Sequence, residues 1–312
     1  MWLTNTARGI ERVIYPISRL SNRAAQGILV ILMTLVTVDV FLRNVVNAPI
    51  FGSYELVELI LLLLIFLGLA NAQVEGAHIR IDFILKKLSE KMRAIIEVLY
   101  CFMSLICFAV IAWRIFFMGM ETLRGEEVSA LLEIPVYPFY WLAAFGTGLF
   151  CLVYLVNLID ALVTALKILK KNAWVYFTGA ALVFLLIASI PWWSRLLPWT
   201  LSNGQMGILC VVLMMILLFS GMPIGPALGG IGFLGFAYLG SIEGSMGIMG
   251  TSPYVTASSF TMSAIPLFVL MGMFCFHSEL SSDIYSTFRY WFGRLPGGSQ
   301  WQPWGDAPGL RP

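Results

Sequence analysis

Residues 172–193 read NAWVYFTGAALVFLLIASIPWW, an uncharged, mostly apolar run long enough to cross a lipid bilayer once. The chain before this run is rich in charge and ends in Lys167, Lys170 and Lys171, whereas the chain after it, from about Asn203, is rich in glycine and almost free of charge. One crossing moves the chain to the other side of the membrane. The run therefore predicts a bridging helix that joins two units and inverts the second.

The composition excludes a soluble globular protein. Of 312 residues, 59% are hydrophobic and 12% are charged, which leaves too few polar side chains to cover a globule in water. We therefore expect an all-α fold, a polytopic helical membrane protein whose first partner is the lipid bilayer. The net charge is only +2, and no nucleic-acid partner is expected.

Neither the cysteines nor the N-terminus indicates a redox site or a cleaved leader. The five cysteines lie in apolar runs, which is typical of small packing residues, and no CxxC pair occurs. The first 20 residues contain no short apolar core followed by a small-residue cleavage site, so we expect no cleaved signal peptide.

Apolar runs predict about eight membrane-spanning helices. They cover residues 24–46, 54–74, 94–117, 137–162, 172–191, 205–221, 223–240 and 264–276. The last run is short and is also compatible with a re-entrant segment.

The distribution of basic residues predicts a cytoplasmic N-terminus, because short cytoplasmic connections carry an excess of Lys and Arg. Basic residues concentrate before the first span, between the second and third, and after the fourth: Arg8, Arg12, Arg19, Arg23, Arg80, Lys86, Lys87, Lys91, Arg93, Lys167, Lys170 and Lys171. The other connections are expected to face outward. Continued alternation makes residues 221–223 a tight cytoplasmic turn and residues 241–263 an outer connection.

Two connections are interpreted as helices that lie on the membrane surface. In residues 81–95 apolar side chains recur at helical spacing, while Lys86, Lys87, Glu90 and Lys91 take the opposite face. The alternative is an ordinary solvated connection, which the apolar stripe disfavours. A second such helix, acidic and less regular, is predicted over residues 118–131.

Four ionisable residues lie near the outer ends of the first two predicted spans. Asp39 and Arg43 are four residues apart on one helix face, and Glu55 and Glu58 open the second span. One hypothesis is a proton or cation pathway, because charges at membrane depth are costly and usually functional. The preferred hypothesis is a set of structural ion pairs that fixes helix packing. Asp160 is interpreted as an interfacial residue.

The two histidines, His78 and His277, are interpreted as single polar residues at membrane boundaries. Haem or metal ligation requires partner ligands at matched spacing or depth, and none is apparent in the sequence. We therefore expect neither a metal site nor a cofactor, and no catalytic residue.

Glycine and proline mark the second unit. Gly225 and Gly229 form a GxxxG pair that allows close helix approach, although such packing occurs in any membrane bundle. Gly221 and Pro223 flank the predicted turn. Pro266 either starts a helix or breaks one where polar groups line a cavity, and the sequence leaves both interpretations open.

The succession of motifs resembles the tripartite ATP-independent periplasmic (TRAP) transporters. DVFLRN at 39–44, YELVELILLLLIFLGLANAQVEGAHIRID at 54–82 and EIPVYPFYW at 133–141 are similar to the small, four-helix membrane subunit. LLFSGMPIGPALGGIGFLG at 217–235, SSFTMSAIPLFVLMGMFC at 258–275 and FGRLPGG at 292–298 are similar to the start of the large subunit. Their order, with a bridging helix, resembles naturally fused small and large subunits.

The resemblance implies a sodium-coupled secondary importer (a symporter) of organic acids in the bacterial inner membrane, and no enzyme activity. A periplasmic solute-binding protein is the implied partner. The small subunit would be a scaffold that includes Asp39, Arg43, Glu55 and Glu58. Its interfacial helix would carry His78, Arg80, Asp82, Lys86 and Lys87. Substrate and sodium would bind in the large subunit.

The resemblance also suggests boundaries. Residues 1–168 form the small subunit, 169–202 the bridging helix and 203–298 an N-terminal fragment of the large subunit. The tail at 299–312, SQWQPWGDAPGLRP, resembles nothing in the family. A disordered C-terminal tail is one interpretation; the preferred one is a frameshifted or otherwise truncated reading frame that cuts the large subunit short. The implied sodium and substrate sites would then be missing, and we expect a scaffold that does not transport by itself.

Two alternatives remain open at this stage. One is a membrane anchor of another complex, such as a redox enzyme, which would favour histidine pairs facing each other across spans. The other is an interaction protein that binds a separately encoded remainder of the large subunit.

Overall fold

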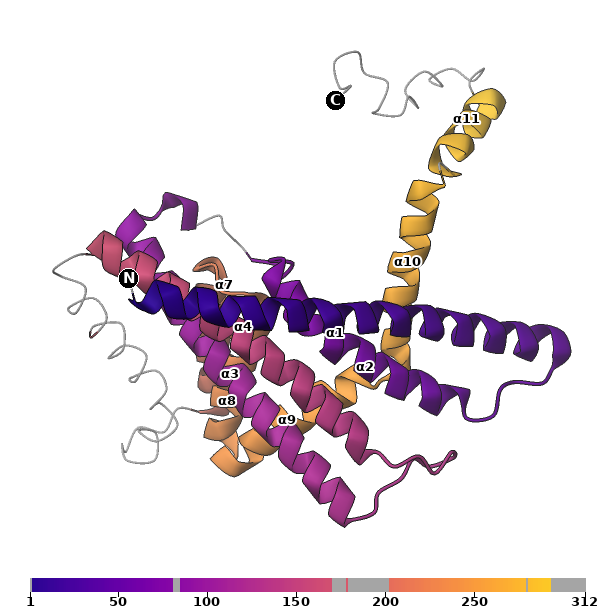
Figure 1. Cartoon of the computed structure of the whole chain (residues 1–312), viewed down its shortest axis with the longest axis horizontal. Helices are drawn as coiled ribbons and strands as arrows, with labels where there is room; N and C mark the ends of the chain where they lie inside the picture. The colour runs from indigo at the N-terminus through magenta and orange to yellow at the C-terminus, as the bar shows by residue number, and fades with distance from the viewer. Residues whose placement is uncertain (1, 81–84, 170–177, 179–201, 279, 293–312) are drawn as a thin grey trace. The chain divides into compact units, whose positions relative to one another are not determined.

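The computed structural model describes residues 2–80, 85–169, 178, 202–278 and 280–292. Within these residues the regular structure is helical, with nine α-helices and a single isolated β-bridge between Val128 and Pro135. The expected all-α, polytopic fold class is confirmed. The chain divides into two compact units, Met1–Phe260 and Thr261–Pro312 (Figure 1).

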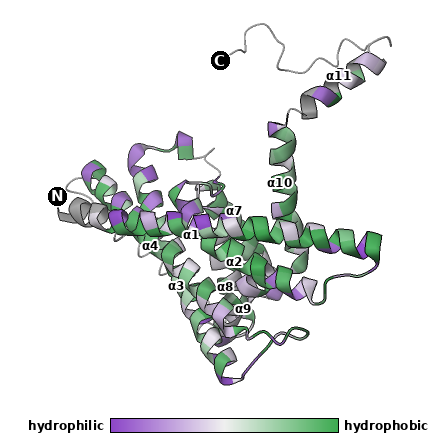
Figure 2. Ribbon diagram, turned by 45° about the vertical axis from the view of Figure 1, so that its right-hand side comes forward, coloured by the Kyte–Doolittle hydropathy of each residue, from purple (hydrophilic) through white to green (hydrophobic). Residues whose placement is uncertain are grey.

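Four long helices form most of the first unit. They are α1 (Trp2–Phe41), which continues as a short π-helix Leu42–Val46, α2 (Ser53–Val74), α3 (Glu90–Arg124) and α4 (Tyr137–Leu169). Each is long and apolar enough to cross a membrane, and each contains one of the first four predicted spans. Figure 2 shows hydrophobic residues along these helices and hydrophilic residues gathered toward their ends.

The structure describes three further helices in the first unit: α7 (Asn203–Phe219), α8 (Ile224–Leu239) and α9 (Ile242–Ala257). The apolar helices α7 and α8 coincide with the sixth and seventh predicted spans but have only 17 and 16 residues. The predicted bridging helix at 172–191 lies outside the described residues.

The second unit contains the end of a 3₁₀ turn (Phe260–Ser263), α10 (Ala264–His277) and α11 (Leu280–Phe292). The turn and α10 together form a fifth apolar segment of membrane-spanning length, Phe260–His277. Pro266 is the third residue of α10, a position where the missing proline N–H breaks no helical hydrogen bond. Its place therefore supports the helix-starting interpretation of this proline.

Serine caps begin several helices. Ser89 Oγ accepts the N–H of Met92 at the start of α3, and Ser241 Oγ accepts the N–H of Gly244 at the start of α9. At the start of α7, Ser202 and Gln205 form a reciprocal capping box. Such caps satisfy N–H groups that have no partner within the helix, which fixes where each helix begins.

Both predicted surface helices differ from the structure. In the region 81–95, residues 81–84 lie outside the described part, Leu85–Lys87 form one 3₁₀ turn, and the Ser89 cap separates this turn from α3. The prediction of one continuous helix is therefore wrong for the described part of that range. The prediction of a separate surface helix over 118–131 is also wrong, because α3 continues to Arg124. The chain then turns at Gly125 and at Glu126, whose φ is 50°.

Helix α9 lies inside the predicted outer connection 241–263 and was not predicted from the sequence. Gly244, Gly247, Gly250 and Pro253 all lower helix propensity in this segment. The Ser241 cap and packing of α9 on α3 and α8 stabilise the helix instead. Tertiary contacts therefore override the local preference, as they often do for weak helix formers.

The core of the first unit lies where α4 packs against α1, α2 and α3. The rings of Phe108, Phe150 and Tyr154 pack edge to face, with centroids 4.5 Å apart for Phe108 and Phe150 and 4.9 Å apart for Phe150 and Tyr154. Phe150 and Tyr154 are fully buried. A separate cluster of Leu32, Val57 and Leu61 holds α1 against α2.

At Gly146, α4 approaches the backbone of α2 closely. A Cβ atom at this position would lie 2.6 Å from the carbonyl carbon of Phe66, too close for any side chain. We therefore expect Gly146→Ala to lower the free energy of unfolding by about 1–3 kcal/mol, because the two helix backbones must separate. Thermal unfolding of the detergent-solubilised chain measures this change.

Gly148→Ala is the matched control on the same helix. No atom lies within 4 Å of a Cβ built at Gly148, so alanine there should be neutral or stabilise α4 by up to about 1 kcal/mol. Equal losses of stability in the two variants would contradict the close contact at Gly146.

Candidate functional site

The predicted polar cluster lies where α1 ends and α2 begins. The π-helix Leu42–Val46 ends at Asn47, whose φ of 56° is left-handed, and α2 starts after Gly52, whose φ is 71°. These two reversals turn the chain back on itself. They bring the end of α1 next to the first turn of α2.

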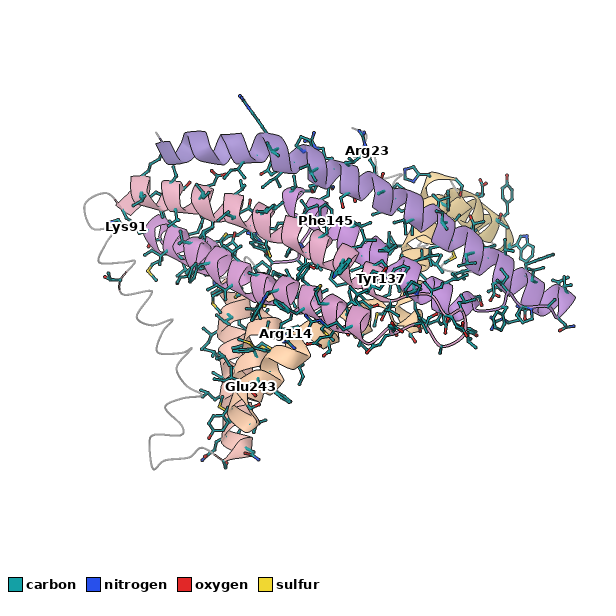
Figure 3. All side chains as sticks on the ribbon, turned by 60° about the horizontal axis from the view of Figure 1, so that its bottom comes forward. Arg23, Lys91, Arg114, Tyr137, Phe145 and Glu243 are labelled. Carbon is teal, nitrogen blue, oxygen red and sulfur yellow. The ribbon has the colours of Figure 1, made fainter. Side chains whose placement is uncertain are left out.

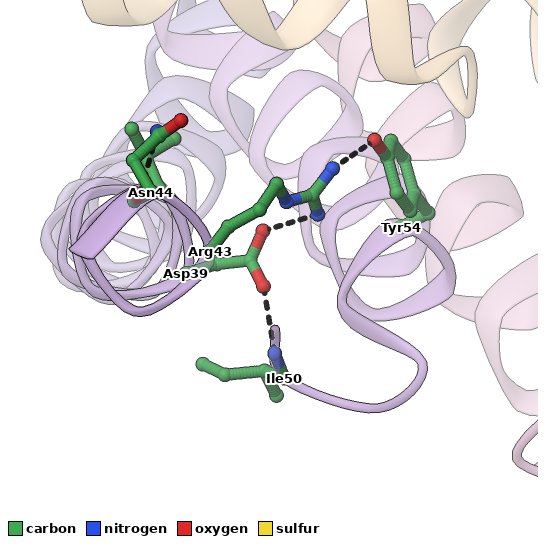
Figure 4. Close-up of polar contacts among 6 residues, drawn as sticks. Asp39, Arg43, Asn44, Ile50 and Tyr54 are labelled. Atoms are coloured by element: carbon green, nitrogen blue, oxygen red, sulfur yellow. Dashed lines mark hydrogen bonds and ion pairs between the residues drawn. The ribbon is translucent and has the colours of Figure 1, made fainter. Parts of the chain in front are cut away.

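Asp39 and Arg43 form an ion pair at this turn (Figure 4). Asp39 Oδ2 lies 2.6 Å from Arg43 Nη2, and Asp39 Oδ1 accepts a hydrogen bond of 2.9 Å from the N–H of Ile50. Asp39 is only 7% exposed. Its carboxylate therefore ties the last turn of α1 to the connection that leads to α2.

Arg43 extends the cluster to α2. Its Nη1 donates a hydrogen bond to the hydroxyl of Tyr54, and its Cζ lies 4.9 Å from the centre of the Tyr54 ring. The Tyr54 ring in turn contacts the Phe260 ring at 4.4 Å between centroids. Arg43 thus links the end of α1 to Tyr54 of α2 by a cation–π contact and a hydrogen bond, and the Tyr54 ring extends this link to Phe260.

Glu55 takes no part in that ion pair. Its two carboxylate oxygens accept hydrogen bonds from the backbone N–H groups of Leu131 (2.6 Å) and Leu132 (2.9 Å) in the connection between α3 and α4. Glu55 therefore fixes a connection more than seventy residues away in sequence. Glu58 is half-buried on α2, and within the described residues it forms no ion pair.

This arrangement holds connections together. Both oxygens of Asp39 and both oxygens of Glu55 are occupied by protein donors, and the bonds from Ile50, Leu131 and Leu132 each join two different segments of the chain. Such charge-assisted hydrogen bonds are stronger than neutral ones. The geometry favours the structural hypothesis for Asp39, Arg43 and Glu55 over the ion-pathway hypothesis.

A second group of polar residues lies near the start of α3, whereas Glu55 contacts the connection that follows its end. Arg80 Nη1 donates to the Tyr100 hydroxyl at 2.6 Å, and its Cζ lies 4.7 Å from the centre of that ring. The His78 ring packs edge to face on Phe150 with centroids 5.5 Å apart. Burial, and to a smaller extent the positive charge of Arg80, lower the pKa of His78, which favours the neutral ring.

The other residues predicted for the interfacial segment are either exposed or outside the described part of the chain. Lys86 and Lys87 are exposed in the 3₁₀ turn, and Asp82 lies outside the described residues. His277 accepts or donates one contact of 2.9 Å between its Nδ1 and the carbonyl oxygen of Met273 on α10. Among the residues that the structure describes, no three His, Cys, Asp or Glu side chains gather to hold a metal ion.

Some of the glycines singled out in the sequence lie against a neighbouring segment, and others face open space. A Cβ at Gly229 of α8 would lie 3.1 Å from Cys107 Sγ of α3, whereas a Cβ at Gly225 would meet nothing within 4 Å. At Gly221, where φ is 84°, a Cβ would collide with Leu85. Pro223 is fully buried and precedes α8. The close contact of α8 with α3 is therefore formed around Gly229 rather than by the whole GxxxG pair.

Further contacts of α9 with α3 and α4 were not predicted from the sequence. A Cβ at Gly250 of α9 would lie 2.7 Å from Cβ of Arg114 on α3, which Figure 3 shows beside α9. The rings of Tyr140 on α4 and Tyr254 on α9 stack with centroids 3.7 Å apart. The three-residue spacing of Gly244, Gly247 and Gly250 was the only signal in the sequence for this contact face.

The Asp39–Arg43 pair generates a testable prediction. Asp39→Asn removes the charge that faces Arg43 and should lower the melting temperature by about 2–4 °C. Because Arg43→Gln removes the other partner, the double variant should lose less than the sum of the single variants. Thermal unfolding in detergent of the four proteins gives this comparison.

Asp160→Asn is the matched control, since Asp160 is an exposed carboxylate on α4. A melting temperature lowered as much by Asp160→Asn as by Asp39→Asn, or single effects that simply add in the double variant, would show that the pair does not stabilise the turn.

Comparison with known families identifies both parts of the chain. Residues 32–164 match the family described as tripartite ATP-independent periplasmic transporters, DctQ component, and residues 211–301 match the family described as tripartite ATP-independent periplasmic transporter, DctM component. The comparison with curated proteins found no match. Both families are components of transporters, so the chain is a membrane transport protein and not an enzyme. Since the two matched ranges together cover more than half of the chain, it belongs to the TRAP transporters and joins a DctQ component to DctM sequence in one polypeptide.

Proposed function

We propose that this chain is the membrane scaffold of a sodium-coupled importer of organic acids. In this proposal residues 1–168 form the platform, residues 169–202 cross the membrane once as a bridging helix, and residues 203–298 begin the large component. The family supports the class of transporter. The sodium coupling and the carboxylate substrates are what the family resemblance implies.

One observation carries the scaffold role: helices matched to the DctM component pack directly on helices matched to the DctQ component. Gly229 of α8 lies against Cys107, Gly250 of α9 lies against Arg114, and Tyr254 of α9 stacks on Tyr140. Small residues at the contact allow helix backbones to approach closely in a bilayer. A fixed platform requires such a direct, close-packed contact.

The proposal also includes orientation and partners. The excess of Lys and Arg in alternate connections supports a cytoplasmic N-terminus. The apolar runs support about eight crossings, and the family supports a place in the bacterial inner membrane. A periplasmic solute-binding protein would deliver substrate on the outer side. The ion pair of Asp39 with Arg43, and the hydrogen bonds of Glu55, would act in the scaffold and would not touch substrate.

A disulfide trap tests the contact between the two components. A Cβ at Gly229 would lie 3.1 Å from Cys107 Sγ, about the separation of a Cβ atom from the partner sulfur in a disulfide. Gly229→Cys should therefore crosslink to the native Cys107 under mild oxidation. A protease site placed in residues 194–200 should then release two fragments only after reduction.

Gly225→Cys is the matched control on the same helix, because a Cβ there would meet nothing within 4 Å. Fragments that separate without reduction in Gly229→Cys, or that stay joined equally well in Gly225→Cys, would contradict the packing of α8 on α3.

Uptake measurements test the scaffold proposal itself. We expect proteoliposomes that contain only these 312 residues, a matched binding protein and an inward sodium gradient to accumulate no labelled dicarboxylate or other organic acid. The physical reason is that the substrate and sodium sites implied by the family lie in later parts of the large component. Sodium-dependent accumulation above that of empty liposomes would refute this expectation.

A further inference from the structure

An apolar groove lies along the last turns of α7. In the described part of the chain it is lined by Leu88 and by α7 side chains that include Val212, Met215, Ile216 and Phe219, and its volume is about 470 Å³. This volume falls within the range of small-ligand sites. Its α7 side chains are 43–57% exposed, so no described helix covers them.

These α7 side chains are exposed because the opposite face of the helix packs against the bundle. Leu217 and Leu218 pack against the buried cluster between α3 and α4. This packing turns Val212, Met215 and Ile216 away from the bundle. In a bilayer, an apolar helix face of this kind contacts hydrocarbon.

Basic side chains flank one end of the groove. The contact of Gly221 with Leu85 holds the short segment 85–88 beside the end of α7, and Leu88 itself lines the groove. Lys86 and Lys87 lie between these two leucines and are exposed. Lys86 directly follows Leu85 and Lys87 directly precedes Leu88, so both residues lie beside this end of the groove. Lys91, in the first turn of α3, is also exposed.

We infer that this groove binds an anionic phospholipid. One acyl chain lies along Val212, Met215 and Phe219, and the headgroup phosphate is held by Lys86, Lys87 and Lys91. An apolar channel that ends at clustered ammonium groups matches the two halves of such a lipid, and basic residues at a membrane surface attract anionic headgroups. The Ser220 hydroxyl donates to the carbonyl of Leu217, so recognition of the headgroup falls to the lysines.

Lipid competition on the full chain tests the charge requirement. Detergent-purified protein is mixed with equal amounts of phosphatidylglycerol and phosphatidylcholine that carry the same acyl chains, and retained lipid is counted by native mass spectrometry. We expect preferential retention of phosphatidylglycerol. Lys86→Gln with Lys91→Gln should weaken its retention by about fivefold per lysine.

Arg12→Gln with Arg19→Gln is the matched charge control, because both arginines are exposed on α1 and neither lines the groove. Equal retention of the two lipids by the unaltered chain overturns the proposal. An effect of the arginine pair as large as that of the lysine pair also overturns it, since general attraction of charge would then explain the binding.

A pair of tryptophan variants tests the groove. Val212→Trp fills it and should abolish retention of phosphatidylglycerol, whereas Ile208→Trp should not, because Ile208 is 67% exposed on the same helix but does not line the groove. Unfolding temperatures in detergent confirm that both variants are folded. Loss of retention in both variants, or in neither, contradicts the proposed site.

A photoreactive residue at the same position identifies the occupant. In membranes, Val212→benzoyl-phenylalanine should form an adduct with the mass of one phosphatidylglycerol molecule. An adduct with residues 172–193 of the same chain, or with a second copy of the chain, would show that a helix fills the groove and would overturn the lipid assignment.

Discussion

Close approach of helix backbones at small residues is the interaction on which the rest of this bundle depends. Helices in a bilayer gain little from the hydrophobic effect when they associate, because lipid tails are as apolar as leucine, so van der Waals contact must hold them together. Gly146 lets α4 reach the backbone of α2 at Phe66. Gly229 and Gly250 give α8 and α9 the same access to α3. The first unit is therefore one packed body around α3 and α4.

Polar side chains complement this packing at the ends of the helices. Asp39 and Arg43 fix the turn between α1 and α2, and Glu55 fixes the distant connection between α3 and α4. Each uses a charged group to satisfy donors or acceptors that hydrocarbon could not. Glycine contacts thus set the distances between helices, while ion pairs and charged hydrogen bonds set the path of the chain between them.

The hydrophobicity of the sequence predicted the long helices well, because a bilayer leaves few alternatives for an apolar run of about 20 residues. It predicted α9 poorly, since Gly244, Gly247 and Pro253 disfavour an isolated helix and only contacts with α3 and α8 reveal why one forms. The neighbourhood of Asp39 and Arg43 followed from their spacing of four. The partners of Glu55 did not, because backbone N–H groups at Leu131 and Leu132 carry no signature in the side-chain sequence.

The lengths of α3 and α4 have a geometric consequence for the transporter. At about 1.5 Å of rise per residue, helices of 35 and 33 residues are each about 50 Å long, whereas the hydrocarbon layer is about 30 Å thick. Ordinary tilts of membrane helices absorb only part of this mismatch. The remaining turns must stand in the headgroup region or in water, so α3 and α4 extend the helical bundle beyond the hydrocarbon layer.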